Sequence, residues 1–336
     1  MKQHRFALLA VAFGFAGALF ARRGVEAQPA PAAPRSLTLA TVAPPGSTWM
    51  RVLDAWNREL RRRTNQTLQL RIYPGGVQGD ESEVVRKVRQ GRLDGAIVTA
   101  VGLAQIHRPA LTFQMPGMFQ NYQQLDNARR ATQTEINQAF DQAGFVFTDW
   151  GDVGFSKVFS NTPVRGPSDL RTTRPYVWRD DLVMPSLFAE TNTTAVPLQL
   201  PEVLSALQTN RVNAFITSPV AALSLQWSTR ATHMTDINVG LVVGATVFGK
   251  RQFQSLSPEH QTAVRETAAQ FHQLLRANLR RDEAAAMRTM SGRGINVITV
   301  DDAARAQWND VFTRTRARLV GQVAEQAFIT RVANAR

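Results

Sequence analysis

The sequence predicts an α/β fold in two lobes, with strands crossing between the lobes at a hinge and one long helix bracing both. Three observations predict it. Strand and helix patterns alternate from residue 36 and resume after a run of Pro and Gly breakers near residue 163. The apolar strand Val239–Phe248 is long enough to return to the first lobe. The helical pattern Pro258–Ser291 spans about 50 Å, more than one small domain requires.

Residues 1–27 have the pattern of a secretory signal peptide. A positively charged start precedes the apolar run Phe6–Ala21, and small residues precede a cleavage site after Ala27. The run is shorter than the roughly 20 residues of a membrane span. Two arginines directly after it leave an uncleaved anchor open as an alternative. We expect cleavage, a Pro/Ala linker over residues 28–35, and export to the periplasm.

The first lobe is expected over residues 36–160 and 245–290. Its strands are expected at Ser36–Thr41, Thr67–Tyr73, Gly95–Ala100, Phe145–Trp150 and Ser156–Ser160. Its helices are expected to begin after Ser47, at Asp80 and at Gln123. An apolar stripe at helical spacing marks the first helix: Met50, Leu53, Trp56 and Leu60. Strands and helices in this order predict a mostly parallel sheet.

The second lobe is expected over residues 161–244 and 291–336. Its strands are expected at Thr173–Trp178, Thr194–Val196, Asn213–Ile216 and Ile295–Val300. Its helices are expected at Leu182–Thr191, at Pro201–Thr209 and after Asp301, the last carrying Trp308 and Phe312.

Composition and motifs exclude several classes of protein. The formal net charge is +13 for 336 residues, but the arginines are scattered rather than gathered in a tract, which argues against nucleic-acid binding. No cysteine is present, and the histidines lack the spacing of a zinc protease. The segment Gly244–Lys250 begins like a phosphate loop, but Arg251 follows where Ser or Thr is needed. We expect no enzyme activity, cofactor or metal.

A ligand cleft is expected between the lobes, lined by loops at the carboxyl ends of strands. Candidate binding residues there are mostly aromatic or hydroxyl-bearing: Trp49, Thr99, Trp150, Tyr176, Trp178 and Thr217. Ser218 and Gln226 are candidates to orient the ligand by hydrogen bonds. The alternative for each aromatic residue is an ordinary core position, as expected for Trp56 and Trp308.

Several segments together resemble the DctP-type solute-binding subunit of TRAP transporters (tripartite ATP-independent periplasmic transporters). They are Leu39–Trp49, Ile72–Gly79, Gly91–Ala96, Pro201–Ala214 and Leu256–Glu259. The resemblance implies a two-lobed periplasmic binding protein fold and a carrier that hands its ligand to a membrane permease. It also implies an organic acid as the usual ligand, clamped by an arginine.

The chain departs from that pattern at the clamp. The two arginine positions of the family fall on Tyr176 and Ser156. Arg179 and Lys157 lie close enough in sequence to be substitutes. Tyr176–Trp178, Phe215–Pro219 and Leu225–Trp227 resemble a divergent branch that lacks the clamp, with Trp227 a further candidate. Some members of this branch associate with a helical-repeat partner protein.

We therefore expect a small ligand that is rather apolar or weakly acidic. Two alternatives remain open from the sequence. One is an exported hydrolase or isomerase, for which the carboxylates near the cleft would be Asp149, Asp152, Asp180 and Asp181. The other is a sensory binding protein that feeds no permease.

Overall fold

The structure, a computed structural model, describes residues 34–336. The expected signal peptide and nearly all of the expected linker lie outside the described residues. The strands are β1 (Arg35–Ala40), β2 (Leu68–Tyr73), β3 (Gly95–Thr99), β4 (Phe145–Phe155), β5 (Lys157–Ser160), β6 (Tyr176–Trp178), β7 (Val196–Leu198), β8 (Ala214–Thr217), β9 (His233–Thr235), β10 (Leu241–Gly249) and β11 (Asn296–Ile298).

The α-helices are α1 (Thr48–Arg63), α2 (Glu81–Arg89), α3 (Ala100–Ala104), α4 (Tyr122–Gln142), α5 (Val183–Glu190), α6 (Val203–Gln208), α7 (Pro219–Ser224), α8 (Lys250–Gln254), α9 (Pro258–Gly292), α10 (Asp302–Leu319) and α11 (Gln326–Asn334). Short 3-10 helices are η1 (Arg108–Gln114), η2 (Pro167–Thr172), η3 (Leu200–Glu202) and η4 (Trp227–Arg230). No helix among residues 34–336 is both long enough and apolar enough to cross a membrane.

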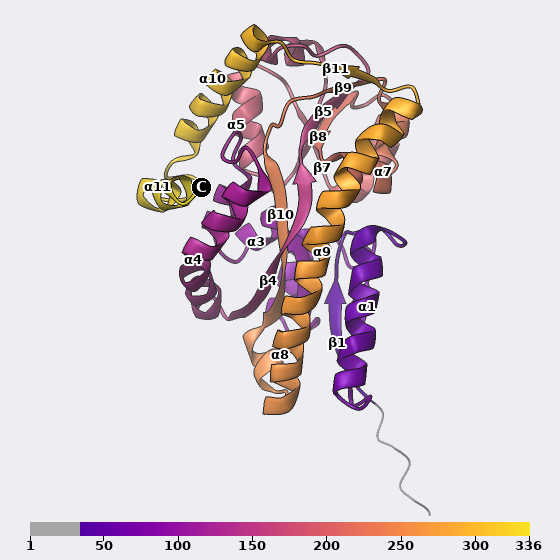
Figure 1. Cartoon of the computed structure of the whole chain (residues 1–336), viewed down its shortest axis with the longest axis vertical. Coiled ribbons are helices and arrows are strands. Elements are labelled where there is room, and N and C mark those ends of the chain that lie inside the picture. The colour runs from indigo at the N-terminus through magenta and orange to yellow at the C-terminus, as the bar shows by residue number, and fades with distance from the viewer. Residues whose placement is uncertain (1–33) are drawn as a thin grey trace, which may run out of the picture. The chain divides into compact units, whose positions relative to one another are not determined.

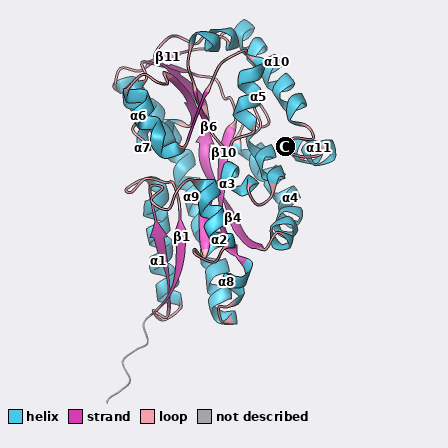
Figure 2. Cartoon of the chain, turned by 180° about the vertical axis from the view of Figure 1, so that it is seen from behind, coloured by secondary structure: helices cyan, strands magenta, loops and turns pink. Residues whose placement is uncertain are grey.

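Two sheets define the two lobes. Lobe I contains the five-stranded sheet β2-β1-β3-β10-β4, in which β1 is parallel to β2 and β3 while β10 is antiparallel to β3 and β4. Lobe II contains the four-stranded sheet β11-β9-β5-β8 and the parallel pair β6-β7. Strands β4 and β10 run through the middle of the molecule with helices on either side (Figure 2). The predicted α/β fold class is confirmed.

The chain crosses between the lobes at two adjacent segments. Strand β4 of lobe I leads through Ser156 directly into β5 of lobe II, and residues 236–240 connect β9 to β10. The two segments are hydrogen-bonded to each other: Ser156 N donates to Gly240 O at 2.8 Å, and Val239 N donates to Ser156 O at 3.0 Å. The boundaries expected at residues 160 and 245 lie close to these crossings without coinciding with them.

Helix α9 is the third connection and runs alongside both lobes (Figure 1). Its buried residues belong to the cores of both. Ser257 caps its start, where the hydroxyl accepts from His260 N, and Pro258 occupies the first turn. Val264 and Ala268 pack with Trp56 and Leu60 of α1 in lobe I. Met290, near the other end, packs in the lobe II cluster. The expected bracing helix is therefore present.

The C-terminal segment is divided differently from the expectation. One helix was expected after Asp301, but a turn at 320–325 separates α10 from α11. Helix α11 packs against α4, where Arg331 forms an ion pair with Glu135 at 2.7 Å. Its Phe328 and Val332 belong to the core cluster that includes Ile136. The last helix thus lies against a lobe I helix, although residues 291–336 were expected in lobe II.

Candidate functional site

A cleft with a cavity volume of about 120 Å³ lies between the lobes. Lobe I contributes the loop after β1, the ends of β3 and β4, and Trp49 of α1. Lobe II contributes Trp178, Thr217 and residues of η3 and α7. Apart from the indole rings, the apolar lining includes Val42, Ile97, Leu200, Leu225 and Leu275. The described lining of the cleft is therefore mostly apolar.

A second cavity of about 90 Å³, here called the polar chamber, adjoins the cleft. Its polar lining includes Gln114, Ser156, Tyr176 and Asp181. The two cavities share the lining residues Thr99, Trp178, Leu200, Thr217 and Val242. The mostly apolar cleft and the polar chamber are therefore neighbouring parts of one interlobe site.

Asp80 joins the two lobes at the cleft. Its side chain caps α2 by accepting from Glu81 N. Its Oδ2 also accepts from Trp178 Nε1 at 2.7 Å and from Leu200 N at 3.3 Å, both in lobe II. Burial raises the pKa of Asp80, and these hydrogen bonds oppose that rise. The carboxyl thus holds an aromatic side chain of lobe II against a helix terminus of lobe I.

Glu81 organises the lobe I wall of the cleft. Its carboxylate accepts from Thr99 N at 2.8 Å, from Thr99 Oγ1 at 2.7 Å and from Gly102 N at 2.8 Å. Burial raises its pKa to about 7 despite these hydrogen bonds. Glu81 therefore fixes the end of β3 and the start of α3, and its oxygens are already engaged by protein donors.

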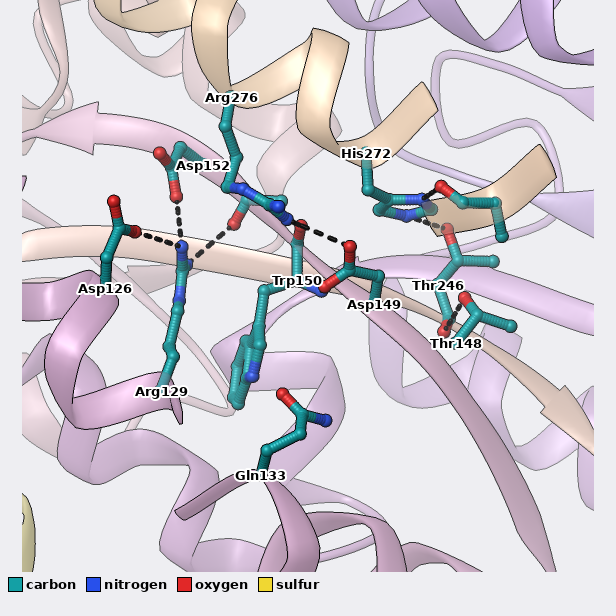
Figure 3. Close-up of polar contacts among 12 residues, drawn as sticks. Asp126, Arg129, Gln133, Thr148, Asp149, Trp150, Asp152, Thr246, His272 and Arg276 are labelled. Atoms are coloured by element: carbon teal, nitrogen blue, oxygen red, sulfur yellow. Dashed lines mark hydrogen bonds and ion pairs between the residues drawn. The ribbon is translucent and has the colours of Figure 1, made fainter. Parts of the chain in front are cut away.

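A buried network of charges anchors β4 between α4 and α9 (Figure 3). The carboxylate of Asp152 is fully buried and lies between Arg129 of α4 at 2.7 Å and Arg280 of α9 at 2.8 Å. Arg276 of α9 pairs with Asp149 at 3.1 Å and donates to Trp150 O at 2.6 Å. These pairs position the crossing strand and satisfy the acids that it carries.

The structure brings together six of the ten predicted binding residues. Trp49, Thr99, Trp178 and Thr217 line the cleft, and Tyr176 and Trp227 line the polar chamber. Trp49 Nε1 donates to Asp152 O at 3.1 Å, which orients its ring. Their contact with a ligand stays a prediction.

The other four lie elsewhere. Trp150 is buried in the core, 4.8 Å from Phe113 and 4.9 Å from Phe147 between ring centroids. Ser218 is fully buried, donates to Val153 O at 2.7 Å and caps α7. Gln226 is exposed in a left-handed conformation before η4. Arg179 is exposed and lies 3.6 Å from Glu202.

Neither proposed substitute for the clamp reaches the cavities. Lys157 is held by Asp236 at 2.6 Å and by Asn238 at 2.7 Å, outside both cavities. Tyr176 and Ser156, at the clamp positions, line the polar chamber. Within residues 34–336, the residues lining the cleft and the chamber include no arginine or lysine.

Three of the four carboxylates considered for catalysis, Asp149, Asp152 and Asp181, make structural contacts. Asp149 and Asp152 are paired with arginines of α4 and α9, as described above. Asp181 accepts from Val183 N at 2.7 Å at the start of α5. These contacts hold the acids in fixed positions.

Two lobes joined by crossing strands and one long helix, with a cleft between them, define a class of solute receptors. Solved structures share this fold. The Bordetella pertussis extracytoplasmic solute receptor DctP7, which binds pyroglutamic acid, is 18% identical with a TM-score of 0.83, covering 90% of this chain and 99% of that one. The sugar acid binding protein DctPAm from Advenella mimigardefordensis, in complex with galactonate, is 14% identical with a TM-score of 0.85, covering 90% and 97%.

The chain matches the model of the DctP family, described as bacterial extracellular solute-binding protein, family 7, over residues 39–320, and it belongs to that family. A solute-binding protein of Chromohalobacter salexigens is 21% identical over 271 residues, 79% of this chain and 80% of its own length. The 2,3-diketo-L-gulonate-binding periplasmic protein YiaO of Escherichia coli is 22% identical over 275 residues, 77% of this chain and 81% of its own length. The chain is therefore a solute-binding receptor of the TRAP type, in a family of receptors rather than enzymes.

Sequence reasoning missed Asp80, Glu81 and Gln114. A capping acid before α2 is visible in the sequence, because Asp80 precedes a helical pattern. Its hydrogen-bond partner Trp178 lies 98 positions further along the chain and cannot be identified from a local pattern. Gln114 lies in the short 3-10 helix η1, and no sequence pattern pointed to it.

Proposed function

We propose that this receptor captures a small, largely apolar organic molecule in the interlobe cleft and delivers it to a membrane permease. The observation that carries the proposal is the combined lining of the two cavities: the cleft is mostly apolar, and the polar chamber, where the clamp positions fall on Tyr176 and Ser156, contains no arginine or lysine among its described residues. A buried carboxylate without a paired cation is costly, so an acid is a poor match for this site.

Relatives with solved structures bind acids. One from Sulfurospirillum deleyianum holds succinate, and one from Sulfitobacter holds galacturonate. Against that background, Tyr176 and Ser156 at the clamp positions favour a different ligand class for this chain. Family membership supports an extracytoplasmic location and a membrane permease as partner. Export through a signal peptide cleaved after Ala27 and association with a helical-repeat partner are further parts of the proposal.

Native mass spectrometry of the protein purified from its own periplasm tests the ligand class, because a closed cleft retains its cargo. We expect a bound mass that matches a molecule without a carboxylate. Titration calorimetry with succinate and galacturonate is expected to show no binding. Tight succinate binding that is lost in Arg179→Ala, but kept in the neighbouring Arg174→Ala control, would refute the proposal.

A further inference from the structure

The polar chamber contains polar atoms that the protein itself leaves unpaired. Tyr176 and Gln114 are 7% and 8% exposed. Among the described residues, neither the hydroxyl of Tyr176 nor Oε1 of Gln114 has a hydrogen-bond partner. Buried polar groups are normally paired, and each unpaired one costs about 1–3 kcal/mol. Two such groups lining one cavity indicate a ligand that supplies the missing partners.

The chamber also combines a buried acid with aromatic rings. Asp181 is buried and accepts from Val183 N and Met184 N, which leaves its carboxylate with further acceptor capacity. The rings of Tyr176, Trp178 and Trp227 line the same cavity. The rings of Tyr176 and Trp227 meet edge to face with centroids 5.5 Å apart. Aromatic faces and a carboxylate together are the surroundings that an organic cation prefers.

Among the described residues that line the chamber, the only formally charged side chain is the carboxylate of Asp181. Burial raises the pKa of the Tyr176 phenol well above its usual range, and the nearby carboxyls of Asp80, Asp181 and Glu81 raise it further. No arginine or lysine of the described chain lines the chamber to offset them. An anionic head group would therefore meet repulsion there, whereas a cationic one would meet an opposite charge.

We propose that the polar chamber binds an organic cation, so that the ligand consists of an apolar body in the cleft and an ammonium head group between Asp181, Gln114 and the aromatic rings. This inference rests on the proposed function, since it names the head group of the ligand that the cleft takes. Asp181 compensates the positive charge, and the unpaired oxygens of Gln114 and Tyr176 accept from the remaining N–H groups.

Three probes that share one body test this inference: 3-phenylpropylammonium, 3-phenylpropan-1-ol and 3-phenylpropionate. Titration calorimetry at pH 7.5 should show the ammonium binding at least tenfold more tightly than the alcohol, and the carboxylate not binding measurably. Asp181→Asn keeps an acceptor for Val183 N and should abolish the preference for the ammonium while leaving the affinity of the alcohol unchanged. Asp180→Asn removes the same charge one residue away and should keep the preference.

Three results would overturn the inference: equal affinity for the three probes, tighter binding of the carboxylate, or no binding of any probe. Asp181→Asn behaving like Asp180→Asn would overturn it as well. A different result refutes the proposed function. It is refuted if the natively purified protein carries a carboxylic acid held through Arg179, whatever affinities the three probes have.

Discussion

The indole Nε1 of Trp178 in lobe II donates a hydrogen bond of 2.7 Å to Oδ2 of Asp80, the residue that caps helix α2 in lobe I. The bond joins two parts of the chain that share no local connection. It therefore links the two lobes through an aromatic residue that lines both cavities, and we expect it to form when the lobes close.

Replacing Trp178 with Phe keeps an aromatic ring but removes the donor to Asp80. A hydrogen bond to a charged group contributes about 1.5–3 kcal/mol, so ligand affinity should fall by about tenfold or more. Small-angle scattering of the ligand-bound variant should show a larger radius of gyration than that of the unmodified protein. Trp49→Phe is the matched control, because it loses an indole donor within lobe I. If the two ligand-bound variants have the same radius of gyration, the Asp80–Trp178 contact does not hold the lobes together.

Glu81 should make stability depend on pH. Its pKa is about 7 in the folded chain against an ordinary 4.5, so between these values the folded state keeps a proton that the unfolded chain has released. Its contribution is thus fully present below pH 4.5 and is lost as the pH rises through 7. From pH 5 to 7.5 the free energy of unfolding should fall by on the order of 2 kcal/mol more than in Glu81→Gln.

Chemical denaturation at both pH values measures this difference. Glu83→Gln on the same helix, where the side chain is half-buried and pairs with Arg86, should retain the pH dependence of the unmodified chain. The prediction is contradicted if the free energy of unfolding changes with pH by the same amount in the unmodified chain and in Glu81→Gln.

Among the acids of the crossing strand β4, Asp152 should be the one whose replacement lowers the free energy of unfolding most. Its replacement by Ala leaves Arg129 buried without its closest counter-charge, which costs about 3–5 kcal/mol in comparable buried pairs. Urea denaturation measures the loss. Asp141→Ala removes an acid from the exposed pair with Lys250 and should cost less than about 1 kcal/mol. Equal effects of the two substitutions would show that the network does not anchor β4.

Gly154, next to the hinge, should not accept a side chain. Its φ of +122° favours glycine, and a Cβ would lie 3.0 Å from the Cβ of Ser218. Gly154→Ala should therefore lower the free energy of unfolding by about 1–3 kcal/mol. Gly292→Ala at the end of α9 meets open space and should change stability little. A neutral Gly154→Ala would mean that the strand adjusts without strain.

The order of elements was predictable because it depends on local patterns. Alternating and 3.6-residue periodicities, together with capping residues such as Ser47 and Ser257, mark most strands and helices. Short elements such as β9 and α3 lack enough residues to show a period and were missed. The sequence also allowed us to predict that Tyr176 replaces the clamp arginine, because counting residues from the neighbouring turn places the arginine position on Tyr176.

The placement of side chains was harder to predict, because it depends on where strands end. The sequence predicts a strand ending at Trp150, which would expose that ring at the cleft. The strand continues to Phe155, so Trp150 lies in its middle and faces the core. Arg179 follows β6 and lies in solvent near Glu202, a partner distant in sequence. Contacts of this kind follow from tertiary packing rather than from any local pattern.

Helix α9 has a further consequence for how solute enters. Both crossing segments and this helix tether the halves of the molecule, whereas Asp80 and Trp178 meet where no backbone runs across. The covalent connections between the lobes therefore lie on one side of the cleft, and the Asp80–Trp178 hydrogen bond lies on the other. We therefore expect solute to enter on the side of Asp80 and Trp178, and we expect the surface around Asp80 to differ between the loaded and the empty receptor.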